Sequence, residues 1–107
     1  MASLSVVYPR TAGTTFNYDY YRSNHLPLVR ERWAGAGLIG GEALLGTTGP
    51  DGSESPYFAI GIIHFDTAEN LQAALNGEHA AEVIGDIMNF TNAQPVIQVN
   101  ERFVPTS

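Results

Sequence analysis

Two residue types that carry much of protein chemistry are missing from the chain, which has no cysteine and no lysine. Without cysteine there is no thiolate nucleophile, no thiolate metal ligand and no disulfide, which excludes a small secreted domain held together by disulfides. Without lysine no side-chain Schiff base can form. The five basic residues are all arginines, and the formal net charge is −6. Because binding to nucleic acid relies on clustered Lys and Arg, we expect no nucleic-acid partner.

Long apolar runs are also missing, since no stretch approaches the roughly 18 residues that a transmembrane helix needs. The first residues, Met1 to Tyr8, contain neither a basic segment nor a long apolar one, so they do not resemble a secretory signal. We therefore expect a cytoplasmic protein with no membrane partner. The length of 107 residues, with 44% apolar and 15% charged residues, predicts one globular domain over residues 1–107.

The pattern of apolar and turn-forming residues predicts four strands and two helical regions in the order βαββαβ. Strands are expected over residues 4–8, 38–46, 57–65 and 95–103, where β-branched and other apolar residues cluster between turn formers. Helical regions are expected over residues 16–33, interrupted at Pro27, and over residues 67–88, interrupted at Gly77. This order predicts an α+β fold of the ferredoxin-like type, in which helices cover one face of a single antiparallel sheet.

The predicted strand over residues 57–65 is apolar on both of its faces. Phe58, Ile60 and Ile62 share one face with His64, and the residues between them include a tyrosine, an isoleucine and a phenylalanine. Helices on one side only would leave an apolar face uncovered. We therefore expect a homodimer, with a second copy of the chain on that face.

The segment over residues 16–28 gathers tyrosines and a histidine on one face of a predicted helix. At about 100° per residue, Tyr18, Tyr21 and His25 fall in one sector, and the last two stand in the i, i+4 relation that lets side chains touch. Pro27 has no N–H to donate and its ring clashes with the preceding turn. We expect the helix to break there, with the preceding residue extended and the His25 imidazole free to reach into a cavity.

His25 and Tyr21 are the candidate catalytic residues. An imidazole with a pKa of about 6.5 can act as general acid or base near neutrality, and a tyrosine with a pKa of about 10 can donate a hydrogen bond to a developing oxyanion. The pair suits proton transfer at carbon next to a carbonyl, which needs no cofactor. Alternatively, His25 bonds the carbonyls freed by Pro27, and the tyrosines only fill the core.

A pocket beside this helix is expected to be lined by residues of the third strand and the second helical region. The expected lining residues are Tyr18, Phe58, Ile60, Ile62, His64, Val83 and Ile87. His64 lines the pocket only if its strand face is turned to the helices; if that face is turned to the partner, it is an interface residue. The three histidines match none of the spacings of zinc motifs, so we expect no metal site.

Two segments carry a resemblance to a known family. They are Tyr20-Tyr21-Arg22-Ser23-Asn24-His25-Leu26-Pro27-Leu28 and Asp86-Ile87-Met88-Asn89-Phe90-Thr91, with a Gly-Pro-Asp-Gly loop between them. Over essentially its whole length, the sequence resembles the EthD family of small dimeric α/β-barrel proteins. The resemblance implies a ferredoxin-like dimer whose two sheets form a barrel, with a pocket in each subunit between sheet and helices. It favours His25, and less strongly Tyr21, as functional residues.

Two classes of function fit these observations. Family members resemble accessory proteins of ether degradation, lactone isomerases, and polyketide cyclases or dehydratases, and many are labelled reductases. The first class is a cofactor-independent enzyme for a small cyclic or aromatic molecule of a degradative or secondary-metabolite pathway; a variant is a cofactor-free monooxygenase whose electron-rich substrate itself activates oxygen. The second class is a non-catalytic homodimer that carries such a molecule for a neighbouring enzyme.

Overall fold

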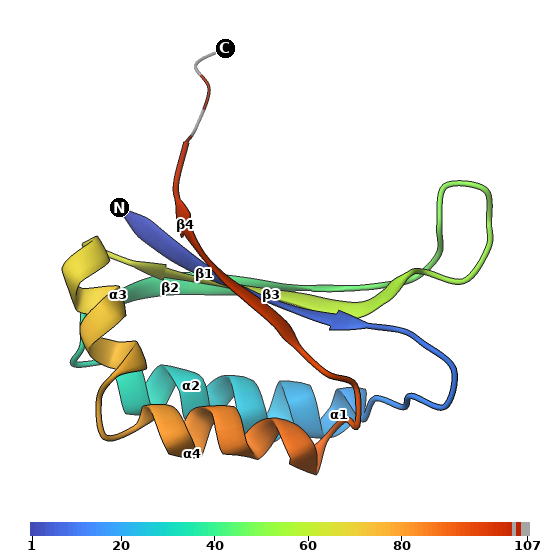
Figure 1. Ribbon diagram of the computed structural model, residues 1–107, viewed down its shortest axis with the longest axis horizontal. Helices are drawn as coiled ribbons and strands as arrows, with labels where there is room; N and C mark the ends of the chain where they lie inside the picture. Colours follow the sequence, from blue (N-terminus) through green and yellow to red (C-terminus); the bar gives the residue numbers. More distant parts are fainter. Residues whose placement is uncertain (104, 106–107) are drawn as a thin grey trace.

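The computed structural model of the chain, described for residues 1–103 and 105, is a four-stranded sheet with helices on one face (Figure 1). Its elements are β1 (Ala2–Pro9), α1 (Tyr18–Tyr20), a π-helical turn η1 (Tyr21–His25), α2 (Leu26–Trp33), β2 (Leu38–Leu45), β3 (Tyr57–Phe65), α3 (Ala68–Leu75), α4 (Ala80–Gly85), a 3-10 turn η2 (Asp86–Asn89) and β4 (Val96–Glu101). The strand order is β2-β3-β1-β4, and every pairing is antiparallel. This arrangement confirms the predicted ferredoxin-like fold.

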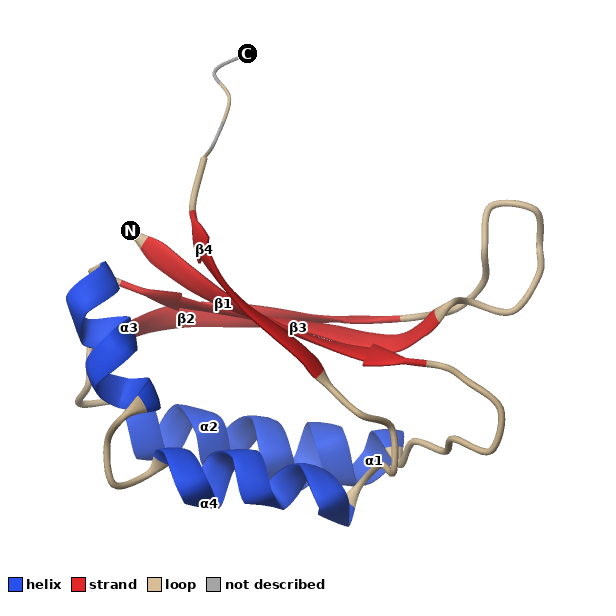
Figure 2. Cartoon of the chain, viewed as in Figure 1, coloured by secondary structure: helices blue, strands red, loops and turns tan. Residues whose placement is uncertain are grey.

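The core lies between the sheet and the helices, because alternate residues of the central strands point to the same side. On β1, Leu4, Val6 and Tyr8 are buried, and on β3 their cross-strand partners include Gly61 and Ala59. Helices α2 and α4 run side by side beneath this face, and α3 closes one end (Figure 2). No helix of the described chain is long and apolar enough to cross a membrane.

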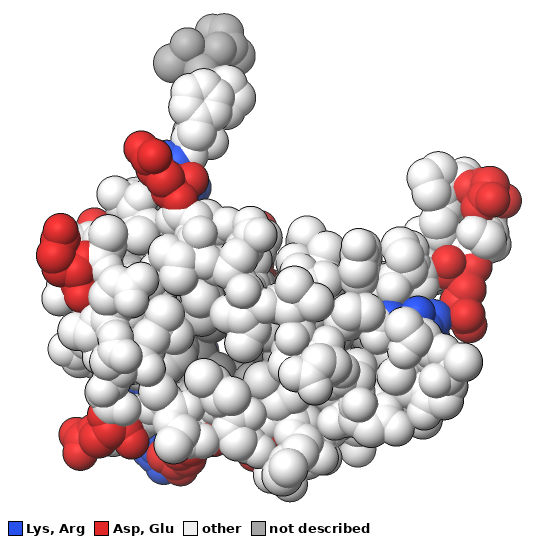
Figure 3. Space-filling view, viewed as in Figure 1, with Lys and Arg blue, Asp and Glu red and all other residues white. Residues whose placement is uncertain are grey.

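The opposite face of the sheet has no helix over it (Figure 2). The strand register lines up Leu44, Ile60, Val7 and Val96 as one apolar row across β2, β3, β1 and β4. Leu44 is 51% exposed and Val96 is 56% exposed. The space-filling view shows the molecule from the side, with the sheet nearly edge-on, and on this side the acidic residues lie mainly at the margins (Figure 3). An apolar surface of this kind is available for an interaction.

The helical path from Tyr18 to Trp33 is continuous, so the expected break at Pro27 and the extended Leu26 were wrong. Leu26 is helical, with φ −62° and ψ −42°, and its N–H donates to the Tyr21 carbonyl five residues earlier. Pro27 then occupies the first turn of α2, where an N–H is not required. The π-helical turn η1 is wider than a regular α-helical turn, and this accommodates the proline that follows it. His25 is the last residue of η1.

Candidate functional site

A cavity of about 380 Å³ lies between η1 and α2 on one side and strands β1, β3 and β2 on the other. Its lining residues are Val6, Tyr8, Tyr21, Arg22, His25, Leu26, Pro27, Val29, Arg30, Leu38, Gly40, Gly41, Glu42, Ala43, Gly61, Ile62 and Ile63. The walls are mainly apolar, and the volume is within the range of small-molecule pockets. Three of the lining residues, Arg22, Arg30 and Glu42, are charged, and all three are exposed.

His25 is paired with a carboxylate from the second helical region of the chain, at the end of α4. Its Nδ1 lies 2.9 Å from Oδ2 of Asp86, the first residue of η2, and His25 is only 4% exposed. The other carboxylate oxygen accepts hydrogen bonds from the Tyr20 hydroxyl at 2.7 Å and from the Asn89 amide at 2.9 Å. Three donors therefore hold Asp86 in one position, and Asp86 in turn orients the imidazole.

The pKa shifts of this pair define its protonation state. Burial lowers the pKa of His25 below its ordinary value and outweighs the hydrogen bond and charge of Asp86, which raise it. For Asp86, burial raises the pKa, but the hydrogen bonds from Asn89, Tyr20 and His25 outweigh it and bring the pKa below its ordinary value. At neutral pH the imidazole is neutral and the carboxylate is ionised.

This protonation state places the lone pair of His25 on Nε2. An ionised carboxylate can only accept, so Nδ1 must carry the hydrogen in the bond to Asp86. Nε2 is then the acceptor nitrogen, and it has no hydrogen-bond partner among the described residues. A neutral imidazole with a free Nε2 at a cavity wall is arranged as a general base.

Tyr21 lies next to this base. Its ring is stacked on His25, with centroids 5.8 Å apart and an interplanar angle of 17°, and it is only 1% exposed. Burial raises the pKa of Tyr21 to about 12, so its hydroxyl stays protonated and can donate a hydrogen bond. The hydroxyl oxygen lies 3.1 Å from where a Cβ on Gly61 would be, and a glycine there lets the hydroxyl approach the sheet.

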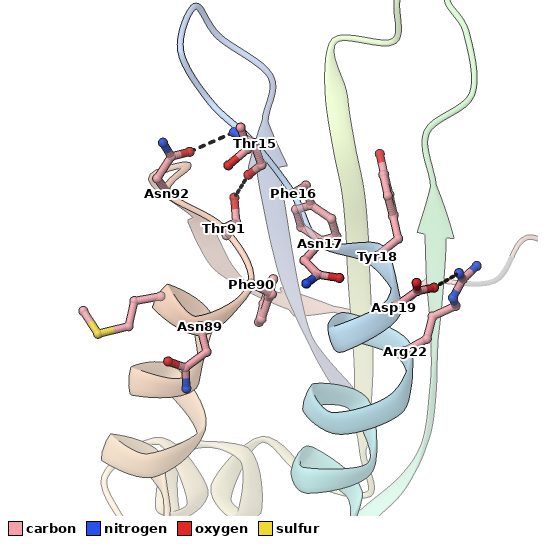
Figure 4. Close-up of a pocket in the computed structure, with 11 residues that line it drawn as sticks. Thr15, Phe16, Asn17, Tyr18, Asp19, Arg22, Asn89, Phe90, Thr91 and Asn92 are labelled. Atoms are coloured by element: carbon pink, nitrogen blue, oxygen red, sulfur yellow. Dashed lines mark hydrogen bonds and ion pairs between the residues drawn. The ribbon is translucent and has the colours of Figure 1, made fainter.

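Tyr18, expected on the same helix face, lines a different cavity. Its hydroxyl donates to the Phe58 carbonyl at 3.4 Å, and its ring borders an open groove of about 850 Å³ between the start of α1 and the segment around η2 (Figure 4). In this groove Asn92 accepts from the Thr15 N–H at 2.9 Å, and the Thr91 hydroxyl donates to the Thr15 carbonyl at 2.6 Å. These bonds join the two sides of the groove.

Of the other expected lining residues, one borders the cavity, three lie in the core and two lie on the outer face of the sheet. Ile62 borders the cavity, although its pairing with Ser5 places it on the same sheet face as Ile60 and His64. Phe58, Val83 and Ile87 are buried in the core, where Phe58 stacks on Phe16 with centroids 5.4 Å apart. The remaining two are on the sheet face turned away from the helices, because Ile60 pairs with Val7 and His64 pairs with Ser3.

His64 therefore corresponds to the second of its two expected positions, on the face that a partner would cover. Its Nδ1 is buried and has no hydrogen-bond partner among the described residues. Ser3 and Asn100 lie in the same cross-strand row, and the Asn100 amide donates to the Ser3 hydroxyl at 3.3 Å. No group of three or more possible metal ligands occurs within residues 1–103 and 105.

Sequence reasoning missed Asp86 and Tyr8. Asp86 entered only as part of a family motif, although it is the single charged residue of the apolar stretch over residues 83–90. A carboxylate in such a stretch is a signal for a buried partner. Tyr8 was assigned to a strand by its alternation, and nothing local to β1 indicates that a helix brings Tyr21 and His25 opposite it.

Comparisons with known proteins identify close structural relatives. A scan against protein-family models finds no match, and a search of curated proteins finds none either. Among solved structures, an EthD-like protein from Ralstonia eutropha JMP134 is 34% identical, with a TM-score of 0.86 over 99% of this chain and 95% of that chain. An ethyl tert-butyl ether degradation (EthD) family protein from Bacillus halodurans C-125 is 21% identical, with a TM-score of 0.77 over 96% and 99% of the two chains.

A more distant likeness concerns the fold alone. An antibiotic biosynthesis monooxygenase is 14% identical, with a TM-score of 0.51 over 98% of this chain and 100% of that chain. The EthD-like protein from Ralstonia eutropha agrees with two observations on this chain, the motif around Tyr21 and His25 and the ferredoxin-like topology. With 34% identity over nearly the full length of both proteins, this chain belongs to the EthD-like family.

Proposed function

We propose that the protein is a cofactor-independent enzyme that moves a proton on a small cyclic or aromatic molecule bound between the sheet and η1–α2. The observation that supports this most strongly is the 2.9 Å contact between His25 Nδ1 and the Asp86 carboxylate. It leaves a basic Nε2 on a nearly buried ring at the wall of a mainly apolar cavity. A general base is most effective in such a setting, where water does not compete.

Each side chain has a separate role in the proposed reaction. His25 Nε2 takes a proton from a carbon next to a carbonyl, and the electrons of the broken C–H bond move into the enolate. Tyr21 donates a hydrogen bond to the oxygen that gains charge. Asp86 stabilises the imidazolium and keeps the ring in position. Return of the proton from His25 to another carbon gives an isomer of unchanged composition. Where the carbon beta to the carbonyl carries a hydroxyl, the enolate expels it by cleavage of the C–O bond, the His25 imidazolium protonates it so that it leaves as water, and the product is the dehydrated compound.

Substitution of His25 tests this proposal. General base catalysis contributes about 10²–10⁴-fold to a rate, so His25→Ala should lower turnover of small lactones, cyclic ketones or phenols by that factor. His79→Ala is the matched control, because His79 is a partly exposed histidine outside the cavity. Unchanged turnover in His25→Ala would exclude the catalytic role. Tight binding by the native protein without any turnover would favour the carrier function instead.

The proposal includes a homodimer formed through the uncovered sheet face. The apolar row of Leu44, Ile60, Val7 and Val96 supports it, since a face of this kind is stable in water when a second copy covers it. Light scattering of the eluting protein should give twice the mass of the chain. Leu44→Glu should produce monomers, whereas the same change at Met88, which is 80% exposed on η2, should not. A native monomer would exclude the dimer.

A further inference from the structure

A second tyrosine lies opposite Tyr21 in the cavity and has no part in the proposed reaction so far. Tyr8, near the end of β1, lines the cavity and is 1% exposed. Its ring meets the Tyr21 ring edge to face, with centroids 5.8 Å apart and an interplanar angle of 78°. One hydroxyl comes from the sheet and the other from the helical layer, and both belong to one cavity.

Neither hydroxyl has a hydrogen-bond partner among the described residues. A tyrosine hydroxyl in a protein interior normally finds one, because an unpaired polar group there costs about 1–3 kcal/mol. Neither oxygen is fully enclosed by protein, because in the described chain the one fully enclosed side-chain nitrogen or oxygen without a partner is on His64, and both tyrosines line the cavity. The two hydroxyls can therefore donate hydrogen bonds to a ligand in the cavity.

The sheet leaves space beside these hydroxyls. Gly61 on β3 pairs with Val6 and with Ala43, so it lies under the cavity, and it has no side chain to fill the space. A Cβ at this position would be 3.1 Å from the Tyr21 hydroxyl oxygen and 3.9 Å from the Val6 carbonyl. Gly61 therefore keeps open the part of the cavity next to Tyr21.

Both tyrosines remain donors across the ordinary pH range. Burial raises the pKa of Tyr8, and the neighbouring Tyr21 raises it further, since two phenolates so close would repel each other. Two protonated hydroxyls in one cavity can both donate to a single ligand oxygen, which has two lone pairs to accept them. A carbonyl oxygen gains charge when its neighbouring carbon loses a proton, and a phenol oxygen gains it on ionisation.

We propose that Tyr8 and Tyr21 together bind one oxygen of the ligand, and that the substrate is a cyclic ketone, lactone or phenol whose carbonyl or phenolic oxygen enters the cavity first. This inference rests on the proposed function and adds Tyr8 to Tyr21 as a second donor to the substrate oxygen. The oxygen lies between two donors, an arrangement that stabilises an oxyanion. His25, stacked on Tyr21, is then beside the ring carbons next to that oxygen.

Binding of para-nitrophenol tests the inference, with para-nitrotoluene as the matched ligand that lacks the phenolic oxygen. The native protein should bind the phenol more tightly than the toluene. A hydrogen bond to a charged group contributes about 1.5–3 kcal/mol, so Tyr8→Phe should weaken binding of the phenolate about tenfold or more and leave nitrotoluene binding unchanged. Tyr21→Phe should do the same, and Tyr57→Phe, at a 42% exposed tyrosine outside the cavity, should change neither.

Absorbance gives a second measurement, because the phenolate of the probe absorbs at longer wavelength than the phenol. The fraction of bound probe that is ionised should fall in Tyr8→Phe relative to the native protein at the same pH. Equal affinity of native protein and Tyr8→Phe for the phenol, or failure of the native protein to bind it, would overturn the inference. If Tyr8→Phe has no effect while His25→Ala still lowers turnover, the inference fails and the proposed function stands.

Discussion

Replacing Asp86 with alanine should destabilise the fold, because it removes a carboxylate that connects the two helical segments beneath the sheet. Asp86 accepts hydrogen bonds from the Tyr20 hydroxyl at 2.7 Å, from His25 Nδ1 at 2.9 Å and from the Asn89 amide at 2.9 Å. Tyr20 and His25 belong to the α1–η1 segment, and Asp86 and Asn89 belong to η2. The substitution leaves three donors without their acceptor.

The three donors contribute unequally to the expected loss. Asn89 is exposed and Tyr20 is half-buried, so both can bond to water in place of Asp86 and contribute little to the loss. His25 is 4% exposed and cannot bond to water, so its Nδ1 becomes a buried donor without a partner. This lowers the free energy of unfolding by about 1–3 kcal/mol. The predicted loss is therefore about 1–3 kcal/mol, most of it from His25, which is a substantial part of the 5–15 kcal/mol typical of a domain.

Urea unfolding followed by tryptophan fluorescence measures this loss, since the one tryptophan, Trp33, is 2% exposed in the native protein. Protein concentration is held constant so that association contributes equally. Asp19→Ala is the control, because the Asp19 side chain is 92% exposed and bonds only Arg22, so it should change the free energy by less than about 0.5 kcal/mol. A change in Asp86→Ala no larger than that of Asp19→Ala would refute the reasoning.

Three further predictions concern pH, the space beside Tyr21 and the core. Burial lowers the pKa of His25, so kcat/KM should rise with its deprotonation at a midpoint below pH 6.5, and it should not fall again until near the pKa of Tyr21, about 12. Gly61→Ala should weaken binding of para-nitrophenol severalfold, because the new Cβ would be 3.1 Å from the Tyr21 hydroxyl; calorimetry measures this. Trp33→Ala should cost about 3–5 kcal/mol of unfolding free energy by circular dichroism in urea.

Each of these has an outcome that would contradict it. A midpoint of kcat/KM at or above pH 6.5 would mean that His25 is better solvated than its 4% exposure indicates. Gly85→Ala is the control for Gly61→Ala, because it adds a Cβ into open space at the end of α4. If both substitutions weakened para-nitrophenol binding equally, the loss would come from the change of glycine to alanine in general and not from the contact with Tyr21. A loss below about 1 kcal/mol in Trp33→Ala would mean that the side chain is not packed against Phe65 as observed.

The elements could be predicted because their signals are local. A strand or helix is recognised from apolar residues spaced at its own period, and turn formers mark where it ends. The close approach of Tyr21 and His25 was also predictable, since residues four apart on a helix are neighbours and a π turn keeps them close. The continuity of the helix through Pro27 was not, because a π turn can accommodate a proline that would interrupt a regular α-helix.

The sequence by itself determined the order of strands and helices, the pairing of Tyr21 with His25 and, through these, the family. Only the tertiary structure decided which side chains from other elements contact Tyr21 and His25. Asp86 reaches His25 across 61 positions of chain, and Tyr8 reaches Tyr21 from the sheet, because the packing of helices on strands sets both contacts. It also decided that His64 is turned away from the helices. A shift of one residue in strand register would reverse that face, and the alternation of a strand apolar on both sides cannot specify it.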